Sequence, residues 1–186
     1  MSPSPSRQRH ATCRCGEVAL VLEGEPIVSS ACYCTSCQSA GETFEALPEA
    51  SRVLETDGGT GFVLFRKDRV RCLMGAERLR EFRLTPSSPT RRVVASCCNT
   101  PMFLEFQSGH WLSIYSRALP ADDRPPLEMR TMTQDRRAGV EFADAIPSPA
   151  KHNGRFMWRL LAAWAAMGFR APKIDWVREA ADEARS

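Results

Sequence analysis

Residues 32–37 read Cys-Tyr-Cys-Thr-Ser-Cys, which places three thiols within six residues. Zinc prefers thiolate ligands in tetrahedral geometry, so cysteines this close together can wrap one ion from a single loop. They leave a fourth position for water or an outside ligand, as in most catalytic zinc sites. The spacing therefore predicts a metal site at Cys32, Cys34 and Cys37, open at one position.

The fourth ligand of this site has two other interpretations. No histidine or acidic residue lies within the run, and the nearest carboxylates belong to Glu42 and Glu45. Either of these could complete the coordination. Alternatively, a distant cysteine could close the site into a structural centre with four ligands.

A second pair, Cys13 and Cys15, is followed by Gly16, which would let the backbone turn sharply around a metal. Two cysteines cannot complete a zinc site, and Cys97 and Cys98 are the obvious source of further ligands. We expect Cys98 to be the better ligand of the two, because adjacent residues rarely point at one ion without backbone strain. Such a site would tie an early strand to a late one and stabilise the fold.

The remaining cysteine and the histidines have simpler interpretations. Cys72 stands alone in an apolar stretch, and we interpret it as a small core residue on a strand. His10, His110 and His152 lie outside the cysteine clusters. We expect each of them to be a surface or structural residue rather than a ligand.

Composition narrows the class of protein. The chain has 186 residues, 43% of them hydrophobic, which suits one globular domain that needs no disulfides to hold its core. Seven of the eight cysteines are clustered, whereas disulfide frameworks spread their cysteines along the chain. The polar N-terminus has no apolar segment of a secretory signal, so we predict a reducing, cytoplasmic setting. A net charge of +3 is too small to predict nucleic-acid binding.

Short apolar runs separated by Gly, Pro and Ser turns predict a mainly β body. The predicted strands cover residues 17–23, 61–65, 69–73, 79–84, 92–96, 102–106 and 111–115.

The regions around this body have different compositions. Residues 1–9 predict a disordered tail, and residues 121–151 a proline-rich connection with at most short helices. Within a C-terminal helical segment at 152–186, residues 155–169 predict a helix that packs on the β body or on a second copy of the chain. This run is shorter than the roughly 20 residues of a membrane span. A short polar helix at 176–184 would close the chain.

The cysteine motifs and their order resemble those of the glutathione-dependent formaldehyde-activating enzyme family, which also includes centromere protein V. The matching pieces are CRCG at 13–16, CYCTSC at 32–37 and CCNTPMF at 97–103. They span roughly residues 10–120, and the last piece resembles a diverged bacterial branch of that family. One departure concerns the late motif, which in the family usually reads Cys-x-x-Cys-Gly. Here Ala95 replaces its first cysteine and Asn99 its glycine.

The resemblance implies an Mss4-like β-tent with zinc-binding cysteine loops and two zinc ions. One would be structural, held by Cys13, Cys15 and the late cysteines, with Cys97 as a candidate for the missing fourth ligand. The other would be catalytic, held by the 32–37 run. The implied activity is that of a carbon–sulfur lyase, which joins or cleaves a thiol and formaldehyde through S-hydroxymethylglutathione. A small thiol such as glutathione would be the partner.

Two other functions compete with this interpretation. A zinc-stabilised β scaffold could act as a binding module for protein or nucleic acid, although acidic residues nearly match the basic ones. Cys34-x-x-Cys37 could also act as a redox dithiol, but it lacks the βαβ pattern of thioredoxin-like motifs. If the substrate is an anionic thiol such as glutathione, basic residues could help to bind it, and the candidates are Arg66, Lys67, Arg69, Arg91 and Arg92.

Overall fold

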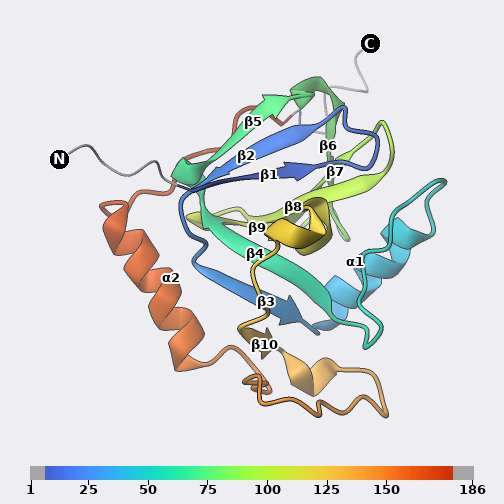
Figure 1. Ribbon diagram of the computed structural model, residues 1–186, viewed down its shortest axis with the longest axis vertical. Coiled ribbons are helices and arrows are strands. Elements are labelled where there is room, and N and C mark those ends of the chain that lie inside the picture. Colours follow the sequence, from blue (N-terminus) through green and yellow to red (C-terminus); the bar gives the residue numbers. More distant parts are fainter. Residues whose placement is uncertain (1–6, 178–186) are drawn as a thin grey trace.

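The computed structural model describes residues 7–177, and the strands in this range form two sheets (Figure 1). The smaller sheet has the order β1-β2-β5, with β1 at Gln8–Thr12, β2 at Ala19–Glu23 and β5 at Val70–Met74. Its two pairings are antiparallel. In Figure 1 it forms the upper layer of the molecule.

The larger sheet has seven strands in the order β10-β3-β4-β9-β8-β7-β6. Their bounds are β3 Val28–Cys32, β4 Thr60–Arg66, β6 Leu79–Phe82, β7 Thr90–Ala95, β8 Thr100–Phe106, β9 Trp111–Tyr115 and β10 Met129–Thr131. Every neighbouring pair is antiparallel except β10 and β3, which run parallel.

Both faces of the larger sheet are buried, as strand β4 illustrates. Val63 and Phe65 point into the core that the two sheets share, whereas Phe62 and Leu64 belong to a second core on the opposite face. This division follows the alternation of side chains along a strand. Strands buried on both faces read as continuous apolar runs, and the segments at 61–65 and 102–106 have that character.

Two helices contribute to the second core. Helix α1 (Thr35–Glu45) packs Ala40 and Phe44 against the sheet, and helix α2 (Gly154–Ala166) packs Phe156 and Leu160. Figure 1 shows them at opposite ends of this face of the larger sheet, with α2 in orange and α1 in light blue. The gap between them leaves part of the sheet without a helix above it.

Helix α2 is held by specific contacts as well as by its apolar side chains. Its N-cap, Asn153, accepts a hydrogen bond from the Phe156 backbone N–H at 2.9 Å. The His110 ring Nε2 hydrogen-bonds to the Leu160 carbonyl oxygen at 2.8 Å, and the same ring stacks on Trp164. His110 therefore has the structural role that we expected.

The mainly β fold and the C-terminal helix are confirmed, but several elements were not predicted. Strand β3 and helix α1 contain both ends of the 32–37 run, which we expected to lie in a loop. Both have polar sequences, VSSAC and TSCQSAGETFE, so their apolar pattern is weak. Strand β10 lies within the proline-rich connection, and β1 begins at Gln8, inside the expected tail. The helix expected at 176–184 falls almost entirely outside the described residues.

Gly75 tests how closely the segment after β5 packs against the loop between β1 and β2. Gly75 and Gly24 have nearly the same positive φ, 77° and 78°, but only at Gly75 would a Cβ collide with another group, the Glu17 carbonyl oxygen. We expect Gly24→Ala to lower the free energy of unfolding by about 1 kcal/mol and Gly75→Ala by about 3 kcal/mol, since the second change adds a backbone collision to the same strain. Urea denaturation of both variants measures the difference, and equal losses would contradict the packing described.

Candidate metal centres and their pocket

Four cysteines meet between the β1–β2 loop and the β7–β8 turn. The Sγ atoms of Cys13, Cys15, Cys97 and Cys98 all lie within 4.8 Å of one another. The Sγ of Cys15 lies 3.3 Å from that of Cys97 and 3.5 Å from that of Cys13. Sulfur atoms around a tetrahedral zinc, with bonds of ~2.3 Å, lie ~3.8 Å apart. The cluster could therefore hold a metal ion, and its all-thiol composition is compatible with zinc.

The backbone around this cluster shows why the late motif can depart from the family pattern. Asn99 has a φ of 54°, in the left-handed region where glycine is favoured and asparagine is the best tolerated of the larger residues. Its side chain also donates a hydrogen bond to the Pro48 carbonyl oxygen at 3.0 Å. Asparagine therefore satisfies the same turn that a glycine would.

Cys97, which we expected to be a poorer ligand than Cys98, also belongs to this cluster. Its Sγ lies 3.8 Å from that of Cys13 and 4.0 Å from that of Cys98, so both adjacent thiols reach the cluster. Ala95, at the position of the missing family cysteine, is buried in strand β7 and packs into the core between the sheets. The fourth sulfur of this cluster is therefore that of Cys97.

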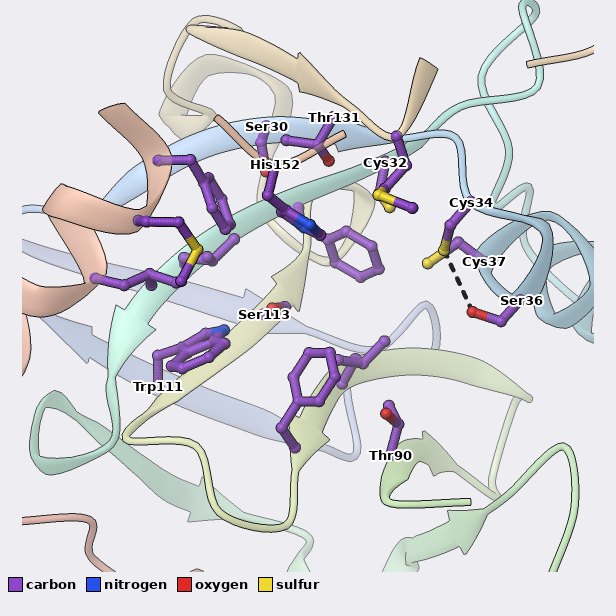
Figure 2. A pocket seen from close by; sticks show the side chains of 18 of the residues that line it. Ser30, Cys32, Cys34, Ser36, Cys37, Thr90, Trp111, Ser113, Thr131 and His152 are labelled. Carbon is purple, nitrogen blue, oxygen red and sulfur yellow. Dashed lines mark hydrogen bonds between the residues drawn. The ribbon is translucent and has the colours of Figure 1, made fainter. Parts of the chain in front are cut away.

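The second cluster lies where strand β3 leads into helix α1. Cys32 is the last residue of β3, Cys34 is the N-cap of α1, and Cys37 lies in its first turn. The three Sγ atoms lie within 4.8 Å of one another, and Cys34 Sγ is 3.2 Å from the Ser36 hydroxyl (Figure 2). The run is thus a strand end and a helix start rather than one loop, and it too could hold a metal ion.

The two carboxylates proposed as a fourth ligand have other partners. Glu42 accepts a hydrogen bond from Arg137 at 2.6 Å. Glu45 caps the following segment by accepting from the backbone N–H groups of Val53 and Leu54 at 2.7 and 2.8 Å. Within residues 7–177 the second cluster contains cysteines alone. Neither Glu42 nor Glu45 belongs to it, because short hydrogen bonds hold both elsewhere.

The three thiols of the second cluster do not ionise alike. Hydrogen bonds from the Cys32 and Cys37 thiols hold the pKa of Cys34 far below its ordinary value. The same contacts raise the pKa of Cys32 and Cys37, which must keep their protons to donate. Three thiolates side by side repel one another, so a bound cation would be needed to stabilise them together.

A pocket of about 320 Å³ opens beside the second cluster, on the helix-covered face of the larger sheet. Figure 2 shows Cys32 and Cys34 at one end of it, Trp111 at the other, and Ser113 between them on the sheet. The imidazole of His152 projects into the same space (Figure 2). His152 is exposed, as expected of a surface residue, but its position beside a cysteine cluster carries no signal in the sequence.

Arg92 is the one member of the basic set from the sequence that lines this pocket. Its side chain is buried, with 2% of its surface exposed, and its Nη2 donates to the Ser36 carbonyl oxygen at 3.0 Å. It pairs with no carboxylate in the described part of the chain, and its Nε has no hydrogen-bond partner there. A buried cation without a counter-ion is costly, so a negative charge is expected close by.

The other basic residues of that set lie away from the cysteines or are already paired. Arg66 pairs with Asp68 at 2.6 Å, and Lys67 and Arg91 both pair with Glu105, at 2.5 and 2.6 Å. Cys72 is partly buried on β5 and packs against the core between the sheets, as expected.

Comparison with known proteins identifies a family that this chain matches. The model of the family described as "Glutathione-dependent formaldehyde-activating enzyme" matches residues 8–125. A crystal structure of a Rhodobacter sphaeroides protein from a structural genomics programme is similar with a TM-score of 0.44 and 16% sequence identity. The similarity covers 63% of this chain and 96% of that one. Comparison with curated proteins gave no match. No helix within residues 7–177 is long and apolar enough to cross a membrane.

Replacing Cys97 tests whether both adjacent thiols belong to the first metal centre. We expect Cys97→Ser to lose one zinc equivalent and to lower the free energy of unfolding by about 4 kcal/mol or more, because a cross-link between the two sheets is lost. Cys72→Ser, the matched control, should keep its zinc and lose about 1 kcal/mol. Elemental analysis and urea denaturation of both variants give the answer, and full zinc in Cys97→Ser would assign the centre to other ligands.

Proposed function

Since this chain belongs to the glutathione-dependent formaldehyde-activating enzyme family, we propose that it is a zinc-dependent enzyme of the carbon–sulfur lyase type. Its substrate is the adduct of a small thiol, of the glutathione type, with an aldehyde such as formaldehyde. Cys32, Cys34 and Cys37 hold the catalytic zinc, and the four-cysteine cluster holds a structural one. The free thiols in both clusters fit a reducing, cytoplasmic setting.

The observation that carries this proposal is the position of the second cluster at the end of a pocket. The first cluster offers four sulfur atoms, enough to complete a tetrahedral site. The second offers three and borders a space large enough for a small molecule. Three protein ligands next to a substrate-sized space is the usual arrangement of catalytic zinc, and four ligands that of structural zinc.

The reaction needs little more than a positioned thiolate. The thiolate sulfur adds to the aldehyde carbonyl carbon, a C–S bond forms, and the carbonyl π pair moves to oxygen, which takes up a proton. The reverse step cleaves the same bond, and no oxidant or reductant is required. Zinc, when bound, would supply the positive charge that keeps a thiol deprotonated at neutral pH. The pocket walls exclude water and orient the reactants.

Arg92 supports this chemistry through its charge. Three thiolates around a divalent zinc would leave a net negative charge, and the buried guanidinium donates to Ser36, in the first turn of α1 beside Cys37. The guanidinium therefore balances the charge of the loaded site. In return, the loaded site provides the counter-charge that Arg92 otherwise lacks.

Removing the triplet should separate its role from that of the first cluster. We expect the native protein to bind one zinc ion per cluster, and the triple variant Cys32→Ser, Cys34→Ser, Cys37→Ser to stay folded with only the structural ion. The native protein should also accelerate the exchange between glutathione, formaldehyde and their adduct, measured by NMR exchange spectroscopy, and the variant should not. If the native protein binds a single zinc ion and the triple variant unfolds, the result favours the binding module instead.

Replacing Arg92 tests its role as counter-charge. Arg92→Met keeps the volume of the side chain but removes its charge, and we expect zinc at the triplet to be released at about tenfold lower chelator concentration. The four-cysteine cluster in the same molecule serves as the internal control and should be unaffected. Arg92→Lys should restore part of the affinity. Equal zinc release from Arg92→Met and the native protein would show that Arg92 balances some other charge.

A further inference from the structure

The pocket beside Cys32, Cys34 and Cys37 has mainly apolar walls from two sources. The larger sheet contributes Phe62, Leu64 and Trp111, whose side chains share its helix-covered face. The C-terminal part of the chain contributes Met132, Phe156 and Met157. The substrate must contact this surface, because the pocket borders the thiols directly.

The C-terminal wall lies outside the part of the chain that matches the family. The family model ends at residue 125, whereas Met132 follows strand β10 and Phe156 and Met157 lie on helix α2. Strand β10 pairs with β3 so that Thr131 lies opposite Cys32, and this register brings the segment to the pocket. The wall is therefore a property of this chain and cannot be read from the family match.

Formaldehyde alone leaves most of this space unused. A pocket of about 320 Å³ has the volume of roughly ten water molecules at ~30 Å³ each, and formaldehyde would replace only one or two of them. An apolar group that filled the rest would gain the free energy of leaving water.

The charges of glutathione are also poorly matched by these walls. Its carboxylates and ammonium group would need polar partners, because burying an unpaired charge is costly. Among the described residues that line the pocket, Arg92 is the one arginine or lysine, and the proposed function assigns its charge to the metal-loaded cysteine triplet. The peptide of glutathione therefore fits better at the mouth of the pocket than inside it.

We propose that the substrate of this site is a thiol–aldehyde adduct that carries an apolar group, aryl or medium-length alkyl, and that this group occupies the pocket. The proposal rests on the proposed function for the reacting centre. The C–S bond forms or breaks at the cysteine triplet, and the oxygen gains or loses a proton as before. The apolar group can belong to the aldehyde or to the thiol, since both meet at the same carbon.

The turnover experiment compares reactant pairs on zinc-loaded native protein. NMR exchange spectroscopy measures adduct formation for glutathione with formaldehyde, glutathione with phenylacetaldehyde, and phenylethanethiol with formaldehyde. We expect at least one apolar pair to exceed the first pair by tenfold or more in kcat/KM, since each buried methylene is worth about fourfold. The faster of the two apolar pairs identifies which reactant carries the group. A first pair as fast as the others would overturn the proposal.

A binding experiment tests the pocket without turnover. Benzyl alcohol, which cannot form the adduct, should bind the native protein in saturation-transfer NMR. Ser113→Leu places a larger side chain on the pocket floor and should weaken this binding at least tenfold. Met157→Ala removes part of the wall and should weaken it about threefold. Leu161→Ala is the matched control, because Leu161 lies on the same helix, is similarly exposed at 45% against 54% for Met157, and does not line the pocket.

The two experiments separate the failure of this proposal from the failure of the proposed function. If no pair is accelerated but benzyl alcohol binds and Met157→Ala weakens it, the lyase activity fails and the apolar pocket stands as a ligand site. If benzyl alcohol binds Met157→Ala and Leu161→Ala as tightly as the native protein, the pocket is not where apolar groups bind. Circular dichroism shows whether Ser113→Leu folds, and the Met157→Ala comparison decides the matter if it does not.

Discussion

The larger sheet buries both of its faces, and the rest of the structure depends on how each face is covered. One face is covered by the three-stranded sheet, and the two share a continuous apolar core. The other face is covered by two short helices that do not meet. The first cover meets the larger sheet at the four clustered cysteines, and the second leaves the pocket between its parts. Both cysteine clusters thus lie where a cover joins the sheet.

The fold was predictable where the chain itself carries a strong local pattern. The apolar runs at 61–65, 102–106 and 111–115 correspond to central strands, and the Ala-, Leu- and Trp-rich segment corresponds to helix α2. Prediction failed for β3, α1 and β10, whose sequences are short and polar. These elements form because of neighbours distant in the chain, as in the parallel pairing of β10 with β3. Local propensity cannot reveal such pairing.

The candidate site was likewise predictable only in part. Close spacing was enough to predict the cysteine triplet, because ligands of one ion must converge. The four-cysteine cluster joins two pairs that are distant in the chain, and it was predicted because one pair cannot complete a zinc site. Spacing alone could not rank Cys97 correctly as a ligand, because its contact with the cluster is made in the turn where Asn99 has a positive φ. Nor could it find His152 or select Arg92 from the other arginines. Both reach the pocket through the topology of the sheet and its helices, which brings distant segments together.

The two helices that cover the second face also differ in how much change they can tolerate. The cysteine triplet is held by strand β3, the start of α1 and hydrogen bonds such as that from Gln38 to the Asp135 carbonyl oxygen at 2.7 Å. The pocket wall depends instead on α2, which contributes apolar side chains but no cysteine. Substitutions in α2 can therefore change the shape of the pocket while the triplet keeps its geometry. In the proposed function, reaction chemistry and substrate size are thus set by separate parts of one chain.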